Sequence, residues 1–175
     1  MTLRRAENAD LDAVMALERR PGYEALVGRS PRAEHENMLA SPRHAYLLGF
    51  LESEVPIAFA ILRDLDNPHG NLYLQRVAVD APGQGRGVQF LTAVIDWTFA
   101  ETSAHRFYLD CFLENSRARR AYEKLGLTHD GILREAYLDS DGKRRDLALM
   151  ALTRPEWRAR RGVGQPLAIG PRGVP

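Results

Sequence analysis

The pattern of apolar and polar residues along this chain changes repeatedly between strand-like runs and helical spacing. Runs rich in branched and aromatic residues, bounded by turn residues, predict strands at 2–5, 44–51, 55–62, 71–79, 106–113, 128–138 and 144–152. Apolar residues at helical spacing predict helices at 8–20, 31–39, 87–100 and 116–125, and 153–157 resembles a capped helix start. Because hairpins interrupt the alternation of strands and helices, we predict an α/β (α+β) fold with a mixed sheet.

Turn and capping residues mark several element ends. Residues 52–54 separate two apolar runs and predict a hairpin. Ser30 followed by Pro31 predicts an N-cap and a first helical position. Asn115 and Gly126 predict the start and the stop of the helix between them. The helix over 87–100 presents four apolar residues on one face: Val88, Leu91, Ile95 and Phe99.

Length and composition indicate one ordinary globular domain, which we place at residues 1–161 of 175. Half of the last 14 residues are Gly or Pro, which predicts a disordered tail over 162–175. We find no apolar run long enough for a membrane span and no apolar signal core at the N-terminus. The single cysteine, Cys111, excludes an internal disulfide, and we expect a cytoplasmic protein.

The net charge of +1 gives no reason to expect nucleic-acid binding. The charge is uneven, however: residues 1–114 hold 11 basic and 16 acidic side chains, and residues 115–175 hold 13 and 7. The basic half is either a solvated surface or a surface that attracts the phosphates of a cofactor.

A glycine-rich segment, 84–88, follows the apolar strand 71–79 and a Pro-Gly turn, and a helix begins at about Arg86. Unpaired amides at a helix N-terminus bind phosphate, and glycines let the backbone approach it closely. A plain tight turn is the alternative. No Lys-Ser or Lys-Thr follows, which excludes a P-loop, and Phe90 stands where a dinucleotide-binding fingerprint needs a small residue.

Asn115 and Tyr122 are separated by two helical turns, so both side chains project from one face. An asparagine at a helix start either caps the helix or positions a neighbouring group. A tyrosine hydroxyl, with a usual pKa of about 10, can protonate a departing thiolate whose pKa is about 8.5. The alternative for Tyr122 is a core tyrosine.

Together these two segments resemble the GNAT family of N-acetyltransferases. The family's loop pattern is Gln or Arg, two residues, Gly, one residue, then Gly or Ala. Here Gln89 stands at the last position, and the matching residues are Gln84, Gly85, Arg86, Gly87 and Val88. The family's later Asn…Tyr…Gly-Phe element is matched by Asn115, Tyr122 and Gly126, with Leu127 where Phe is usual. The order of elements agrees from residue 3 to about 152.

The resemblance implies a sheet splayed open in the middle, with acetyl-CoA in the gap. The backbone of Val77 and Val79 would pair with the pantetheine arm, and the amides of residues 84–88 would hold the pyrophosphate. Asn115 would contact the cofactor arm, and Tyr122 would be the general acid. A primary amine would attack the thioester directly. The family also contains many dimers, and a homodimer would be consistent with it, although nothing in the sequence establishes one.

Within the GNAT family, the chain resembles the ribosomal-protein alanine N-acetyltransferase type. The catalytic glutamate of that type lies five residues before the asparagine that Asn115 matches here. Asp110 stands there in this chain. An ammonium substrate must lose a proton before it attacks, which suits a carboxylate base. The alternative is a strand carboxylate bonded to neighbouring amides. Cys111 should face the side opposite Asp110, which argues against a cysteine nucleophile.

Two other kinds of chemistry lack support in the sequence. The five histidines match no metal-ligand spacing, so we expect no metal. Residues 139–142 begin like a calcium loop, but Met150 stands at its twelfth position, so we predict a turn.

Residues 117–120 are either a solvated helix face or a contact for the cofactor's adenosine phosphate. The leading hypothesis is an acetyl-CoA-dependent N-acetyltransferase, and the alternative is a non-catalytic acyl-CoA-binding sensor or interaction module.

Overall fold

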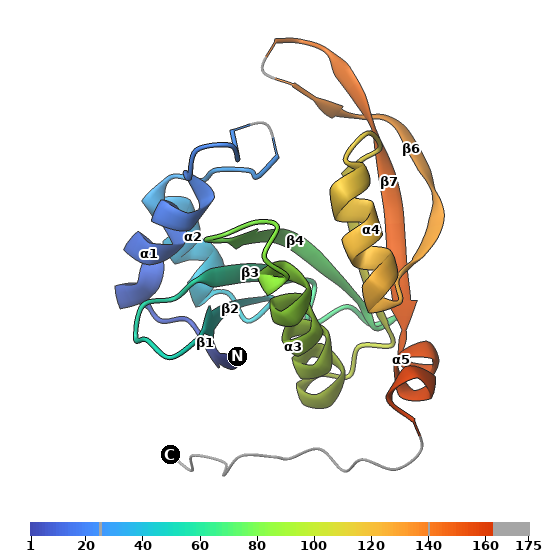
Figure 1. The fold of residues 1–175 in the computed structure, drawn as a ribbon, viewed down its shortest axis with the longest axis horizontal. Coiled ribbons are helices and arrows are strands. Elements are labelled where there is room, and N and C mark those ends of the chain that lie inside the picture. The colour runs from blue at the N-terminus through green and yellow to red at the C-terminus, as the bar shows by residue number, and fades with distance from the viewer. Residues whose placement is uncertain (25, 140, 163–175) are drawn as a thin grey trace.

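The computed structural model describes residues 1–24, 26–139 and 141–162, and in this part of the chain seven strands form one mixed sheet in the order β1-β2-β3-β4-β5-β7-β6 (Figure 1). The strands are β1 (Thr2–Arg5), β2 (His44–Phe50), β3 (Ala58–Arg63), β4 (Asn71–Val79), β5 (Arg106–Phe112), β6 (Thr128–Leu138) and β7 (Arg144–Thr153). The helices are η1 (Asn8–Asp10), α1 (Leu11–Glu18), α2 (Arg32–Ala40), α3 (Arg86–Glu101), α4 (Ser116–Leu125) and α5 (Arg154–Arg161).

The sheet is splayed at its centre, between β4 and β5. All other neighbours are antiparallel, but these two are parallel and pair only over Asn71–Tyr73 and Arg106–Tyr108. Beyond this short ladder the two strands diverge, and Figure 1 shows the two halves of the sheet opening away from each other. The prediction of a mixed, centrally splayed sheet is therefore confirmed.

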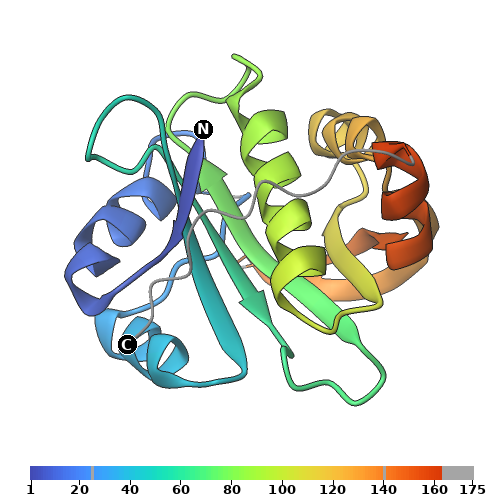
Figure 2. The same ribbon diagram turned by 90° about the horizontal axis from the view of Figure 1, so that it is seen from below.

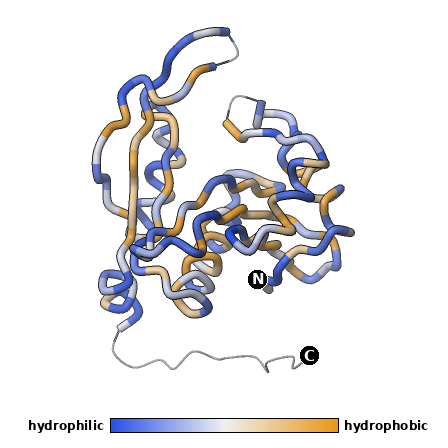
Figure 3. Tube along the Cα trace, turned by 180° about the vertical axis from the view of Figure 1, so that it is seen from behind, coloured by the Kyte–Doolittle hydropathy of each residue, from blue (hydrophilic) through white to orange (hydrophobic). Residues whose placement is uncertain are grey.

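Helices cover both faces of the sheet (Figure 2). On one face α1 and α2 bury an apolar cluster against β2 and β3, formed by residues that include Leu11, Val14, Met38, Phe59 and Ile61. On the other face α3 and α4 pack on the strands through Phe90, Val94, Phe99 and Tyr122, among others. In Figure 3 the hydrophobic positions follow the strands, whereas α5 is mostly hydrophilic.

Local signals fix both ends of α4 and the start of α5 as predicted. The Asn115 side-chain oxygen accepts a hydrogen bond from the Ala118 amide at 3.1 Å, and Gly126 adopts the left-handed conformation with φ of 95°. Thr153 and Glu156 form a capping box before α5. The predicted turn over 139–142 is present in its described residues, where the Gly142 amide donates to the Asp139 carbonyl.

Three sequence predictions were wrong in detail. β3 begins at Ala58 rather than Val55, because Pro56 has no amide to donate to the sheet. The N-cap of α2 is Pro31, not Ser30. The buried stripe of α3 includes Phe90, Val94 and Thr98, whereas Val88 is only half-buried. Because an α-helix has about 3.6 residues per turn, its buried face shifts gradually around the helix along the chain. Packing against the sheet then decides which positions are covered.

The assignment of residues 1–161 to one domain stays a prediction, and the predicted tail lies, from residue 163 on, outside the described residues. No helix in the described ranges is long and apolar enough to cross a lipid bilayer.

Candidate active site

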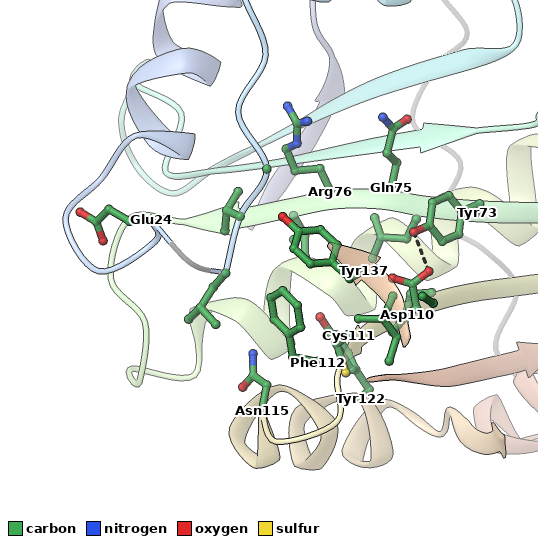
Figure 4. Close-up of a pocket in the computed structure, with 18 residues that line it drawn as sticks. Glu24, Tyr73, Gln75, Arg76, Asp110, Cys111, Phe112, Asn115, Tyr122 and Tyr137 are labelled. Carbon is green, nitrogen blue, oxygen red and sulfur yellow. Dashed lines mark hydrogen bonds between the residues drawn. The ribbon is translucent and has the colours of Figure 1, made fainter. Parts of the chain in front are cut away.

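A cleft of about 410 Å³ lies where β4 and β5 diverge (Figure 4). Its walls come from the α1–α2 loop (between Glu18 and Arg32), from β4 and β5, from α4 and its N-cap, and from β6 and β7. Four predicted site residues line it together: Val77 from β4, and Asp110, Asn115 and Tyr122 from β5 and the segment that follows it. Figure 4 shows the side-chain nitrogen of Asn115 directed into this space, while its oxygen caps α4.

Tyr122 is buried, with only 9% of its surface exposed. Burial raises the pKa of its hydroxyl above the usual value, and the neighbouring Cys111 and Asp110 raise it further. The hydroxyl therefore keeps its proton at neutral pH and is available as a donor to a group in the cleft.

Asp110 is held by a tyrosine that the sequence did not indicate. The Tyr73 hydroxyl, on β4, donates a 2.8 Å hydrogen bond to Oδ2 of Asp110, on β5. Burial and the negative charge of Asp110 raise the pKa of Tyr73, so this hydroxyl stays a donor. The two residues are 37 positions apart, and no local pattern marks such a pair.

Cys111 is half-buried and packs against the apolar core, although it also borders the cleft. Burial, reinforced by the charge of Asp110, raises the pKa of its thiol to about 11. The residue is therefore a protonated thiol at neutral pH, which gives no support to a cysteine nucleophile.

The glycine-rich segment forms the turn between β4 and α3. Gly85 caps α3 with φ of 76°, a conformation that favours glycine. Among the described residues, no backbone or side-chain acceptor takes a hydrogen bond from the amides of residues 84–88. A Cβ placed on Gly85 or Gly87 would meet no described atom within 4 Å. These open, unpaired amides at a helix N-terminus fit a phosphate-bearing group.

Charged side chains flank the same turn. The Arg86 guanidinium turns back to Asp80 in a 2.6 Å ion pair, and it does not project from the turn as a free cation. A Cβ on Gly83 would lie 3.7 Å from the guanidinium of Arg117, so this arginine borders the turn from α4. The Gln89 side chain is exposed. The backbone amides and Arg117 are therefore the groups best placed to meet an anion.

The backbone groups of Val77 and Val79 face the open edge of β4. The amide of Asp80 donates to Ile57 on the β3 side, and alternate residues direct their groups to opposite edges of a strand. Val77 lines the cleft. At Val79 the Tyr23 hydroxyl donates to the carbonyl oxygen at 2.7 Å and accepts from the amide at 3.3 Å.

In the described ranges, no group of three or more His, Cys, Asp or Glu side chains is arranged to hold a metal ion. The side chains that line the cleft include the hydroxyl of Tyr122, the carboxylate of Asp110 and the thiol of Cys111.

Comparison with known proteins gives one family. The profile described as the acetyltransferase (GNAT) family matches residues 11–127. A variant of spermidine N-acetyltransferase SpeG from Vibrio cholerae is 19% identical with a TM-score of 0.79, covering 93% of this chain and 100% of its own. The SpeG structure with CoA and spermine is 20% identical, with a TM-score of 0.76 and coverages of 89% and 96%.

A third similar structure is the ribosomal-protein-S18-alanine N-acetyltransferase from Escherichia coli. It is 26% identical, with a TM-score of 0.71, and the alignment covers 87% of this chain and 92% of that protein. The spermidine enzymes support the fold, and the family match extends over β4, the turn after it, β5 and α4, which supply part of the cleft.

Proposed function

The chain belongs to the acetyltransferase (GNAT) family, and from this premise we propose that it transfers an acetyl group from acetyl-CoA to a primary amine by direct attack in a ternary complex. The acceptor is a protein N-terminus or a small-molecule amine. The observation that carries the proposal is the meeting of Tyr122 and Asp110 in one cleft at the splay of the sheet.

Tyr122 is the general acid. The amine nitrogen attacks the thioester carbonyl carbon, the carbon–sulfur bond breaks, and the departing sulfur takes the proton of the Tyr122 hydroxyl. The proton that the nitrogen loses as the amide forms restores the Tyr122 hydroxyl. The raised pKa of Tyr122 means that this proton is present at neutral pH. General acid catalysis of this kind contributes roughly 100-fold to 10,000-fold to a rate.

Asp110 is the acceptor of the ammonium proton, and Tyr73 orients it. The hydrogen bond from Tyr73 occupies Oδ2 and leaves Oδ1 available to an amine or to a bridging water. A carboxylate in this position also attracts a cationic amine into the cleft. Glu24, on the α1–α2 loop, adds a second carboxylate to the lining of the cleft, on a different wall from Asp110.

Acetyl-CoA fits the remaining groups. The unpaired amides of residues 84–88 would hold the pyrophosphate at the N-terminus of α3, and Arg117 would meet an adenosine phosphate. The open edge of β4 at Val77 and Val79 would pair with the pantetheine arm, and the Asn115 amide would contact the same arm. We expect no metal, and a cytoplasmic location and a homodimer stay expectations.

The test is calorimetric titration of the purified protein with acetyl-CoA, with desulfo-CoA as the control. We expect micromolar binding, followed by thiol release when a panel of N-terminal peptides and polyamines is supplied as acceptors. The peptides and the polyamines separate the two acceptor classes, which the spermidine and ribosomal-protein enzymes represent among similar structures. A protein that binds neither compound would contradict the proposal.

A further inference from the structure

One hydroxyl occupies both backbone groups of Val79 at the open edge of β4. Tyr23 lies in the α1–α2 loop, 56 residues from Val79, and its oxygen contacts the Val79 carbonyl at 2.7 Å and the Val79 amide at 3.3 Å. Val79 is only 7% exposed as a result of its packing. The hydrogen-bonding capacity that this residue presents to the open edge is therefore already used by the protein itself.

The Tyr23–Val79 contact lies outside the lining of the cleft. Val77 lines the cleft, but none of the described residues from 79 to 88 does. The unpaired amides of the β4–α3 turn lie on the far side of Val79 along the chain. A ligand that spans from the turn to Asp110 must therefore pass the position that the Tyr23 hydroxyl holds.

The two ends of the α1–α2 loop are held differently. Near its base, Arg76 donates to Glu18 at 2.8 Å and to the Ser30 hydroxyl at 3.3 Å, and Glu18 is fully buried. Further along the loop, the Tyr23 carbonyl accepts from the amides of Leu26 and Val27. Tyr23 and Val27 pack on the apolar cluster under α1 and α2, and the Tyr23 hydroxyl adds a hydrogen-bonded contact with β4, whereas the base is held by a buried ion pair.

We propose that the Tyr23 hydroxyl competes with acetyl-CoA for the backbone of Val79. Binding of the pantetheine arm displaces the hydroxyl from Val79 and shifts the loop residues beside it, of which Glu24, Leu26 and Val27 line the cleft. The bound cofactor therefore changes the position of the loop residues that face the amine acceptor. This inference rests on the proposed acetyl-CoA binding.

The direct test is the affinity of Tyr23→Phe for acetyl-CoA, measured by calorimetry against the intact protein. This substitution removes only the hydroxyl and retains the ring. A typical hydrogen bond contributes about 1 kcal/mol. Because the variant lacks the hydroxyl that competes for Val79, its acetyl-CoA binding should be about fivefold tighter. Tyr108→Phe, which removes a hydroxyl from β5, is the matched control and should bind acetyl-CoA as the intact protein does.

An unchanged or weaker affinity in Tyr23→Phe overturns the inference, provided that the intact protein binds acetyl-CoA. Absence of binding in the intact protein would instead refute the proposed function. The two failures are thus distinguishable in the same titrations.

Hydrogen–deuterium exchange gives a second readout that does not depend on activity. The amides of Leu26 and Val27 donate to the Tyr23 carbonyl, so a shift of Tyr23 should expose them. Acetyl-CoA should speed exchange of the peptide that contains these amides in the intact protein, as followed by mass spectrometry. In Tyr23→Phe this exchange should already be fast without cofactor. Slower exchange of the intact protein on adding acetyl-CoA would contradict a displaced Tyr23.

Discussion

The Tyr73 hydroxyl donates to Asp110 across the splay of the sheet, at the last residue of β4 that pairs with β5. This bond links the two diverging strands and orients one carboxylate oxygen. It places a negative charge at the floor of a cleft in which Tyr122 holds a proton. Two hydroxyls with raised pKa values therefore border one carboxylate, and each has a different proposed role.

Removal of the Tyr122 hydroxyl tests the general acid. Tyr122→Phe should lower kcat by at least about 100-fold, because the departing thiolate loses its proton donor. The affinity for acetyl-CoA should change by less than about twofold. Thiol-release kinetics measure kcat, and calorimetry measures the affinity for acetyl-CoA. Equal rates in the variant and the intact protein would remove Tyr122 from the mechanism.

Asp110→Asn tests the proton acceptor. The amide cannot accept the ammonium proton, so the rate should fall by about 100-fold or more, and most at low pH, where the amine is protonated. Tyr73→Phe should give a smaller loss, since it removes only the orienting bond. The pH profile of kcat/KM from pH 6 to 9 distinguishes the roles. A loss that is uniform with pH and accompanied by a lower Tm would indicate a structural carboxylate.

Gly87→Asp tests the phosphate site. The position has ordinary backbone geometry and open space, and a carboxylate in the first turn of α3 favours the helix, so the Tm should not fall. The same charge should repel the pyrophosphate and weaken acetyl-CoA binding by more than about tenfold. Gly131→Asp, at an equally open position on β6, is the control. Equal affinities in both variants would place the phosphates elsewhere.

Glu18 should make the stability of the protein sensitive to acid. Burial alone would raise its pKa, but the hydrogen bond from His35 and the charge of Arg76 outweigh burial and lower it. Because the folded pKa lies below the unfolded value of about 4.3, this stabilisation is complete above that value and is lost as the pH falls through the folded pKa.

The substitution Glu18→Gln measures that contribution. At pH 7 it should reduce the free energy of unfolding by about 3 kcal/mol, because it leaves Arg76 without its buried partner. The difference from the intact protein should shrink as the pH falls below about 4. Glu36→Gln, at an exposed ion pair, should cost less than about 1 kcal/mol. A difference that stays constant with pH would contradict the assignment.

Arg154 stabilises the end of α3 from the start of α5. Its guanidinium donates to the carbonyls of Phe99, Thr102 and Ala104 at 2.5, 2.9 and 2.8 Å. Arg154→Ala should therefore lower the free energy of unfolding by about 2–4 kcal/mol, as measured in urea. The exposed Arg158→Ala is the control. Acetyl-CoA affinity should be unchanged in both variants, and equal stabilities would show that the three bonds contribute nothing net.

Local signals in the sequence were sufficient for most of the elements. β4 and α4 have the bounds that were predicted, since a strand run or a helix with its own cap and stop depends on residues a few positions apart. The motif order and spacing also led to the family that the comparison gives. Errors arose where packing overrides local preference, as at Ser30, which is buried beside Arg76 and Glu18 and does not cap α2.

The side-chain pairs that shape the cleft were decided by the tertiary structure alone. Tyr73 and Asp110 are 37 residues apart, Tyr23 and Val79 are 56 apart, and Glu18 and Arg76 are 58 apart. Such pairs form only when the splayed sheet and the α1–α2 loop bring distant segments together. The sequence by itself therefore determined most of the elements, the glycine-rich turn and the candidate acid, because each is local. The folded chain determined what surrounds them, because burial and long-range contact exist only after packing.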